Sequence, residues 1–286
     1  MSCAADLPPK GIQAFVAERV SGPCHWARLP GGRTNRSWRV SGAACDWVIK
    51  LFDPNRSNRL FPNDPKAERH ALMALAGQEI APEFVAHFEV REGACLIYDY
   101  VEGVLVDKTD PDTIRALGHL HGVSPSSELR KIDTQPVALL EQGRFFLQGL
   151  ATALARHLSS AEPVPFPVVS GQDVFLHGDP VPANVLIHDG RHRFIDWQCP
   201  ACGDATADLA IALSPAMHHV YGKGGFSTAD QQAALAAYPD AETIARYRQL
   251  APFYQWRMAA YCAWKAAQGE AIYEVAAEAE LNPERA

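Results

Sequence analysis

Apolar and polar positions alternate along the chain in short stretches that end at turn residues. Residues 174–176, 185–188 and 193–195 are β-prone runs, and Asp189-Gly190 separates the last two. An Asp-Gly pair between two such runs is a strong signal for a two-residue hairpin turn. The pattern therefore predicts a short strand at 174–176, followed by a β-hairpin.

Two other β-prone runs lie in the first third of the chain, at residues 46–52 and 96–101. The first carries one lysine, Lys50, among apolar side chains. A lysine inside such a strand is costly unless its ammonium group is paired, binds a phosphate or reaches solvent from a sheet edge. Lys50 is therefore a candidate ligand-binding residue, and an edge position is the structural alternative.

Aspartate-proline pairs mark the expected helix starts, because aspartate caps a helix and proline suits its first turn. Asp64-Pro65 predicts a helix that ends near Gly77, and Asp110-Pro111 predicts a second helix. A third expected helix begins near Pro136 and continues through residues at helical spacing, namely Phe146, Leu150, Leu154 and Leu158.

Composition favours a globular protein that acts on small molecules. The chain has 286 residues, of which 48% are hydrophobic and 21% charged, and its net charge is -7. It shows no basic amphipathic face, which disfavours nucleic acid and membrane lipid as partners. Residues 1–10 lack the features of a secretory signal, and no apolar run approaches the roughly 18 residues that span a bilayer. A cytoplasmic location is expected, and the sequence gives no indication of the oligomeric state.

Seven cysteines, an odd number, suit reduced thiols better than a disulfide framework. Cys199 and Cys202 have the C-x-x-C spacing of a redox dithiol or of half a zinc site. No second pair of ligands stands at a zinc-binding spacing. We expect structural thiols here, with redox or metal regulation as the alternative.

The segment that follows the strand at 174–176 carries the clearest candidate chemistry. It contains His177-Gly178-Asp179-Pro180, then Asn184, and Asp196 after the expected hairpin. A phosphoryl-transfer site needs one group to orient and deprotonate the attacking hydroxyl, and oxygen ligands that hold magnesium on the nucleotide phosphates. Asp179 suits the first role, and Asn184 and Asp196 suit the second. The four-residue string alone is also compatible with an ordinary turn.

A glycine-bearing turn at residues 29–35 leads into another strand-like run and is a candidate phosphate loop. Gly31 and Gly32 let backbone amides approach phosphates closely, and Thr34 and Asn35 add short polar side chains. The chain has no G-x-x-x-x-G-K-[ST] motif, so a P-loop kinase is disfavoured.

The catalytic segment resembles the catalytic and metal-binding loops of the aminoglycoside phosphotransferase and choline kinase superfamily, which are protein-kinase-like enzymes that phosphorylate small-molecule alcohols. The resemblance extends from about Leu29 to Asp208. It implies an α+β, two-lobed protein-kinase-like fold, with a small N-terminal lobe built on an antiparallel sheet and a larger, mostly helical C-terminal lobe. Residues 1–103 are expected to form the nucleotide-binding lobe, which includes the hinge. Residues 104–286 are expected to form the catalytic and acceptor-binding lobe.

The resemblance also implies roles for single residues, with ATP and Mg²⁺ as the cofactors. Lys50 is the nucleotide lysine, and Glu68 on the first expected helix holds it, although spacing alone leaves Glu68 as a solvated helix residue. Backbone atoms of the hinge are expected to meet adenine at Asp99, Tyr100 and Val101. The carboxylate of Asp208 is expected to brace the catalytic loop. An aspartate at a helix start also suits an N-cap, and the two roles are compatible.

The acceptor is expected to be a small alcohol, with a preference for a cation of the choline, ethanolamine or thiamine type. Residues 177–286 carry 13 acidic and 8 basic side chains, a net charge of -5. Several aromatic residues near the C-terminus attract cations in principle, but helical spacing makes core packing the first interpretation for Tyr247, Tyr254, Met258 and Tyr261. The alternatives are an aminoglycoside, sugar or homoserine kinase of the same fold, or a catalytically silent nucleotide-binding regulator.

Overall fold

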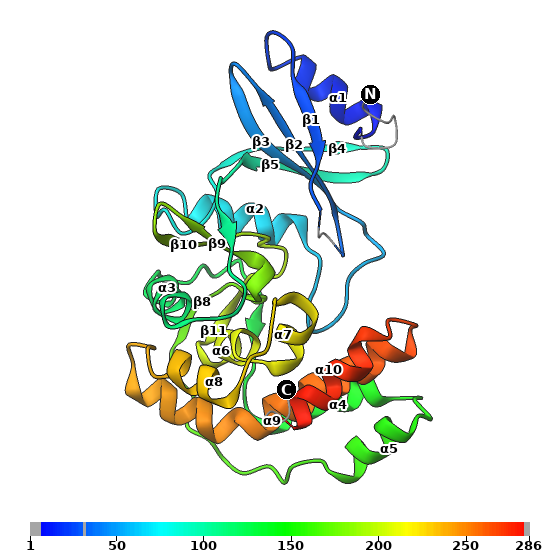
Figure 1. The fold of residues 1–286 in the computed structure, drawn as a ribbon, viewed down its shortest axis with the longest axis vertical. Helices are drawn as coiled ribbons and strands as arrows, with labels where there is room; N and C mark the ends of the chain where they lie inside the picture. Colours follow the sequence, from blue (N-terminus) through cyan, green and yellow to red (C-terminus); the bar gives the residue numbers. More distant parts are fainter. Residues whose placement is uncertain (1–6, 31–32, 283–286) are drawn as a thin grey trace. The chain divides into compact units, whose positions relative to one another are not determined.

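The computed structural model describes residues 7–30 and 33–282, which form two compact units (Figure 1). The first unit comprises Met1–Gly103 together with Ile195–Cys199, and the second comprises Val104–Phe194 and Pro200–Ala286. The short segment 195–199 thus leaves the second unit and packs with the first. Gly31 and Gly32, two of the expected phosphate-loop residues, lie outside the described residues.

In the described part of the first unit, five strands form one antiparallel sheet in the order β1-β2-β3-β5-β4. The elements of this unit are α1 (Lys10–Ala17), β1 (His25–Arg28), β2 (Arg36–Gly42), β3 (Cys45–Leu51), α2 (Pro65–Ala74), β4 (Phe84–Val90) and β5 (Gly93–Asp99). The runs expected at 46–52 and 96–101 are therefore strands β3 and β5.

Alternation along the strands explains why the sheet buries one face against α1. Trp38 and Val40 of β2 and Ile49 and Leu51 of β3 belong to one apolar cluster, which also includes Ile12 of α1. Successive side chains in a strand point to opposite faces, so the residues between them face away from this cluster. Lys50, which lies between Ile49 and Leu51, is consequently directed to the other face of the sheet.

Helix α2 begins where the sequence predicted. The side chain of Asp64 accepts hydrogen bonds from the backbone amides of Lys66 and Ala67, and Pro65 occupies the first turn. The helix ends at Ala74, and Gly77 follows with a positive φ of 74° that favours glycine. The capping groups therefore fix both ends of the helix that carries Glu68.

The second unit is mostly helical in its described part (Figure 1). Its helices are α3 (Pro111–His121), α4 (Pro136–Leu147), α5 (Ala153–Ser160), α6 (Thr206–Ala212), α7 (Pro215–Tyr221), α8 (Thr228–Leu235), α9 (Ala241–Ala267) and α10 (Ile272–Leu281), with the 3₁₀ turn η1 at Pro182–Asn184. Its strands are β6 (Val104–Leu105), β7 (Lys131–Ile132), β8 (Asp173–Leu176), β9 (Val185–His188), β10 (Arg191–Phe194) and β11 (Ala201–Asp204).

The predicted hairpin is confirmed as β9 and β10. Val185 pairs with Phe194 and His188 with Arg191, so Asp189 and Gly190 form a two-residue loop. Both loop residues have positive φ, 48° for Asp189 and 74° for Gly190, as a type I′ turn requires. Within the described residues β10, β9 and β6 make one small sheet, and β7, β11 and β8 make another.

The helix expected to run from Pro136 through Leu158 is wrong as a single element. The structure has two helices, α4 and α5, separated by residues 148–152. Gly149 adopts a positive φ of 77°, which ends the first helix, and the hydroxyl of Thr152 accepts a hydrogen bond from the amide of Ala155 and caps the second. The apolar residues keep their helical spacing across residues 148–152, but Gly149 and Thr152 end one helix and begin another there.

Helix α9 packs against α4 and α10 and forms much of the core of the second unit (Figure 1). The core interpretation of its regularly spaced residues is confirmed, because all of them are buried: Tyr247, Tyr254, Met258 and Tyr261. Across residues 7–30 and 33–282, the structure contains no helix both long and apolar enough to span a membrane.

Candidate functional site

Lys50 is buried on an inner strand of the five-stranded sheet. Strand β3 pairs with β2 on one side and β5 on the other, and the Lys50 side chain is only 3% exposed. The alternative of a lysine that reaches solvent from a sheet edge is thereby excluded. A charged group in this position needs partners of opposite charge.

Two carboxylates pair with this lysine. The ammonium Nζ lies 2.5 Å from Oε2 of Glu68 on α2 and 2.5 Å from Oδ1 of Asp196. Glu68 is 1% exposed, so it is a buried partner and not a solvated helix residue. The structure thus brings together Lys50, Glu68 and Asp196, which the sequence placed in one nucleotide site.

The three charges explain the directions of the pKa shifts. Burial acts to lower the pKa of Lys50, but the carboxylates of Asp196 and Glu68 outweigh it and raise the pKa. Burial raises the pKa of Glu68 to about 7, with Lys50 opposing and Asp196 reinforcing the rise. One ammonium faces two carboxylates, of which only Glu68 is buried, so ionisation of both leaves an excess of negative charge that a bound cation would offset.

Asp196 has an unusual backbone conformation. Its φ is 62°, in the left-handed region that is uncommon for residues other than glycine, and its side chain is 36% exposed. Trp197, the next residue, is fully buried. The packing of Trp197 thus holds the segment in place, whereas the carboxylate of Asp196 remains accessible. Backbone strain of this kind occurs frequently at functional sites.

Asn35 is buried in a network of amide side chains at the start of β2. Its Nδ2 donates to Oδ1 of Asn63 at 2.8 Å and to Oε1 of Gln198 at 3.1 Å. Its Oδ1 accepts from Nδ2 of Asn63 at 2.9 Å and from the amide of Asp53 at 3.1 Å. The side chain therefore fastens the expected phosphate loop to the segment after β3 and to Gln198, while Thr34 beside it is half-buried.

The expected hinge residues follow the inner strand β5. The amide of Asp99 donates to the carbonyl of Glu83, and the amide of Tyr100 donates to the carbonyl of Asp46. These two amides are therefore already used in backbone hydrogen bonds. Contact with an adenine edge at this position would therefore use carbonyl oxygens or the amide of Val101, and this role stays a prediction.

In the second unit, Asp179 and Asn184 lie on the loop between β8 and β9. The Nδ2 group of Asn184 donates to the backbone carbonyl of Asp179 at 2.9 Å and to its carboxylate Oδ2 at 3.3 Å. Asn184 is 8% exposed, whereas Asp179 is half-buried. The amide nitrogen is thus used within the loop, which leaves the amide oxygen of Asn184 as the atom for a metal ligand.

Asp208 braces this loop from α6. Its Oδ2 accepts from the amide of His177 at 2.8 Å, and its Oδ1 accepts from the amide of Gly178 at 2.8 Å. Gly178 has a φ of 83°, so the turn before Asp179 favours glycine. Helix α6 begins at Thr206, and Asp208 lies inside its first turn, so the N-cap interpretation is wrong.

Two residues that the sequence did not assign to the site complete this brace. Nε2 of His121 lies 3.2 Å from Oδ2 of Asp208, and its Nδ1 lies 2.9 Å from the hydroxyl of Tyr238. Because a carboxylate only accepts, Nε2 carries the proton and Nδ1 accepts from Tyr238. No local pattern in the sequence pointed to Tyr238, which lies in the turn after α8.

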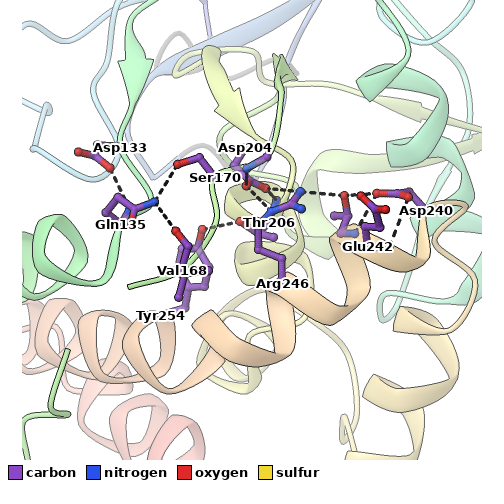
Figure 2. A network of polar contacts seen from close by, with 12 residues as sticks. Asp133, Gln135, Val168, Ser170, Asp204, Thr206, Asp240, Glu242, Arg246 and Tyr254 are labelled. Atoms are coloured by element: carbon purple, nitrogen blue, oxygen red, sulfur yellow. Dashed lines mark hydrogen bonds and ion pairs between the residues drawn. The ribbon is translucent and has the colours of Figure 1, made fainter. Parts of the chain in front are cut away.

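A second polar network holds the start of α6 (Figure 2). Asp204 accepts from Nε of Arg246 at 2.5 Å, from the amide of Gly171 at 2.8 Å and from the amide of Thr206 at 3.0 Å. Burial acts to raise the pKa of Asp204, but these hydrogen bonds, with that of Arg246 the strongest, lower it. Thr206 also contacts the hydroxyl of Tyr254 at 2.9 Å. The helix that carries Asp208 is therefore anchored at its first residue.

Cys199 and Cys202 lie beside Asp196 in sequence but differ in their surroundings. Cys199 is buried, and Cys202 is half-buried in strand β11. All six cysteines within the described ranges are free thiols. In the same part of the chain, no group of three or more histidine, cysteine, aspartate and glutamate side chains is arranged to hold a metal ion.

The sequence profile of the phosphotransferase enzyme family matches residues 25–253, and the chain belongs to this family. The protein is a small-molecule kinase of the aminoglycoside phosphotransferase and choline kinase superfamily, as the sequence resemblance predicted. A comparison with curated proteins gave no match.

Solved structures confirm the predicted two-lobed kinase-like α+β fold. Choline kinase from Cryptosporidium parvum aligns over 96% of this chain and 95% of its own, with 13% identity and a TM-score of 0.66. Spectinomycin phosphotransferase APH(9)-Ia, in complex with ADP and spectinomycin, aligns over 98% and 93%, with 13% identity and a TM-score of 0.63. A choline/ethanolamine kinase family protein from Mesorhizobium loti aligns over 93% and 87%, with 18% identity and a TM-score of 0.57.

Proposed function

We propose that the protein transfers the terminal phosphoryl group of ATP to the hydroxyl of a small molecule. The observation that carries this proposal is the burial of Lys50 between Glu68 and Asp196, each 2.5 Å from its ammonium group. Kinases of this fold use a strand lysine held by a helix glutamate to position nucleotide phosphates. ADP in the spectinomycin phosphotransferase structure is consistent with this use of the fold.

The oxygen ligands fit magnesium, which when bound neutralises charge on the nucleotide phosphates. Asn184 would contribute its amide oxygen, since its nitrogen donates to Asp179. Asp196 would contribute its accessible carboxylate. Magnesium is commonly held by one or two protein ligands together with phosphates and water, so the pair is sufficient. The excess negative charge around Lys50 also favours a cation.

Asp179 would orient the acceptor hydroxyl and take its proton. Its backbone is fixed from two directions, by the hydrogen bond from Asn184 and by the amides of His177 and Gly178 that bind Asp208. A positioned carboxylate of this kind reduces the entropic cost of bringing the hydroxyl to the phosphorus. Catalysis would therefore consist of positioning and charge neutralisation.

We propose a small cationic alcohol of the choline, ethanolamine or thiamine type as the acceptor. Burial raises the pKa of Tyr261 in α9, and Tyr273, Tyr221 and Cys262 add to the rise. Asp179 makes a smaller electrostatic contribution to the same shift, so it lies near this side chain. The aromatic rings around it already hold an ammonium group. Nζ of Lys265 lies 5.4 Å from the ring centre of Tyr273 and 6.0 Å from that of Trp264. These contacts show that a cation packs beside aromatic rings in this region, but Tyr261 and Tyr273 are buried, so the support for a cationic acceptor is the net charge of -5 over residues 177–286.

The test is a panel of specificity constants. Choline and its uncharged carbon isostere 3,3-dimethylbutanol isolate the contribution of charge, and ethanolamine, thiamine, homoserine, a sugar and an aminoglycoside complete the panel. A cation against an aromatic face gains about 0.5–2 kcal/mol, so choline should exceed its isostere by roughly 2- to 30-fold. Equal constants, or a clear preference for homoserine, the sugar or the aminoglycoside, would reject the cationic acceptor and leave the kinase assignment intact.

A catalytically silent nucleotide-binding regulator is the alternative from another class. It predicts ATP binding without transfer to any member of the panel. The presence of Lys50, Asp179, Asn184 and Asp196 together argues against it, because the groups that phosphoryl transfer needs are all present. Transfer to one acceptor excludes it.

A further inference from the structure

Cys24 and Cys45 flank the same glycine in the five-stranded sheet. Cys45 begins β3 and pairs with Gly42 of β2. On the other side of β2, His25 of β1 pairs with Ser41, so the register continued by one residue places Cys24 opposite Gly42. A cysteine just before β1 and the first residue of β3 thus stand on either side of one residue without a side chain.

The missing side chain of Gly42 lets the two thiols converge. A Cβ atom at this position would lie 3.5 Å from Sγ of Cys24, 3.8 Å from Sγ of Cys45 and 3.1 Å from the carbonyl oxygen of Pro23. The chain before β1 therefore folds over Gly42 and carries Cys24 towards β3. Both cysteines belong to the apolar cluster between the sheet and α1.

The electrostatics of Cys45 show that the thiols interact. Burial raises the pKa of Cys45 to about 11, and an electrostatic interaction and a hydrogen bond with the thiol of Cys24 add to the rise. The two sulfur atoms face the same point beside Gly42, which agrees with this interaction. A disulfide requires Cα atoms within about 7 Å of each other, so closure needs the chain before β1 to move over Gly42 towards β3.

One of the two thiols is accessible. Cys24 is half-buried and lines a surface cavity of about 560 Å³ between the end of α1, the following turn and Trp26. Cys45 is 8% exposed. A reagent in solution therefore reaches Cys24 first. Arg19 also lines the cavity, and its exposed guanidinium group, which contacts Glu18, suits a carboxylate-bearing molecule.

We propose that Cys24 and Cys45 form a thiol pair that reacts with a low-molecular-weight disulfide of the glutathione class and closes to an intrachain disulfide. The thiolate of Cys24 attacks one sulfur of the reagent, forms a mixed disulfide and releases one thiolate. The thiolate of Cys45 then attacks Sγ of Cys24, breaks the mixed disulfide and releases the second thiolate. Two protein thiols are oxidised, their protons are released to solvent or to the departing thiolates, and one reagent disulfide is reduced to two thiols.

The cross-link would tie β1 to β3 and enclose the loop before β2. Lys50 lies five residues beyond Cys45 on the same strand, so the cross-link is at the opposite end of β3 from the expected nucleotide site. A disulfide that closes the loop between Cys24 and Cys45 should raise the midpoint of thermal unfolding by on the order of 5 °C. The inference does not depend on the proposed function.

The experiment treats the reduced full-length protein with oxidised glutathione and maps disulfides by mass spectrometry of non-reduced peptides. The expected product is a Cys24–Cys45 disulfide, with loss of two hydrogen atoms and no retained glutathione. Cys45→Ser should stop at a glutathione adduct on Cys24, and Cys24→Ser should give neither adduct nor cross-link at this site. Cys262→Ser, a buried cysteine elsewhere, is the matched control and should react like the wild type.

Gly42→Ala supplies a second variant, because its Cβ would press on Pro23 and on both sulfur atoms and should slow closure relative to adduct formation. The wild-type peptide map decides the question even where a variant fails to fold. A wild-type product that remains a mixed disulfide, an unreactive Cys24, or a cross-link from Cys24 to any other cysteine would overturn the proposal.

Discussion

Lys50 and Asp196 lie 146 positions apart in the chain, and yet the ammonium Nζ of one is 2.5 Å from the carboxylate Oδ1 of the other. The contact forms because residues 195–199 pack with the first unit, anchored by the fully buried Trp197. A metal-ligand candidate and a phosphate-binding candidate thus share one ion-pair cluster with Glu68. Each residue is expected to affect binding of the phosphate-bearing part of the nucleotide.

Lys50→Ala should weaken binding of ATP and ADP by at least 10-fold while changing adenosine affinity little, because the ammonium group is expected to contact phosphates only. Isothermal titration calorimetry with the three ligands measures the difference. Lys131→Ala, which alters an exposed lysine on β7, is the matched control. Unchanged ATP affinity in Lys50→Ala would remove this lysine from the nucleotide site.

Asp196→Ala should abolish phosphoryl transfer and weaken magnesium-dependent ATP binding, since it removes one of the two proposed metal ligands and leaves Asn184. Binding of ATP with and without magnesium, followed by fluorescence or calorimetry, separates this effect from that of Lys50. If magnesium strengthens ATP binding as much in the variant as in the wild type, Asp196 is not a ligand.

Asp179→Asn should keep nucleotide affinity near that of the wild type and reduce kcat by about 10²–10⁴-fold, the usual scale for loss of a positioned base. Asparagine has nearly the same size, so the loop geometry should survive. Asp189→Asn, in the hairpin turn, is the control, because asparagine tolerates the positive φ of that position. Near-normal turnover in Asp179→Asn would exclude Asp179 from the chemistry.

Asp208→Ala should lower kcat and stability together, since it leaves the buried amides of His177 and Gly178 without their acceptor, at a cost of about 1–3 kcal/mol for each group. Tyr238→Phe removes only the outer hydrogen bond of the brace, to His121, and should cost about 1 kcal/mol. Denaturant unfolding and steady-state kinetics measure both effects. Equal effects of the two variants would contradict the order of contacts described above.

Glu280 should make folding stability fall as the pH rises. Burial raises the pKa of this carboxyl from 4.5 to about 7, against hydrogen bonds from the hydroxyl of Ser214 and the amide of Ala216. Between these values the folded protein holds a proton that the unfolded chain has released. The group's stabilising contribution is therefore complete below about pH 4.5 and is lost as the pH rises through about 7, by up to roughly 3 kcal/mol.

The measurement for Glu280 is urea unfolding at several pH values between 4.5 and 8 for the wild type and Glu280→Gln. The amide is neutral at every pH, so the variant should show a smaller decline across this range. Glu278→Gln, at the next glutamate of α10, is the control. Identical pH profiles for the wild type and Glu280→Gln would show that Glu280 is ionised in the folded state throughout.

Much of the local structure could be predicted from the sequence. The Asp189-Gly190 turn, the cap of α2 at Asp64-Pro65 and the strand around Lys50 depend on short-range chemistry, and each formed where its residues indicated. Where two local signals conflicted, the stronger one prevailed. Gly149 and Thr152 divided the helix that apolar spacing had extended from Pro136 to Leu158, because a left-handed residue and a new cap end one helix and start another.

The sequence by itself determined the chemical inventory of the site, since the segments that carry Lys50, Asp179, Asn184 and Asp196 resemble this superfamily closely enough to predict a kinase. Only the tertiary structure decided how the side chains are used. It showed that the side-chain amide of Asn35 forms hydrogen bonds with Asn63, Gln198 and the backbone of Asp53. It also showed that Glu68 is buried against Lys50, and that Tyr238 supports the catalytic loop through His121. Partners so distant in the chain leave no periodic trace in the sequence, because burial and hydrogen bonding between them depend on how separate elements pack.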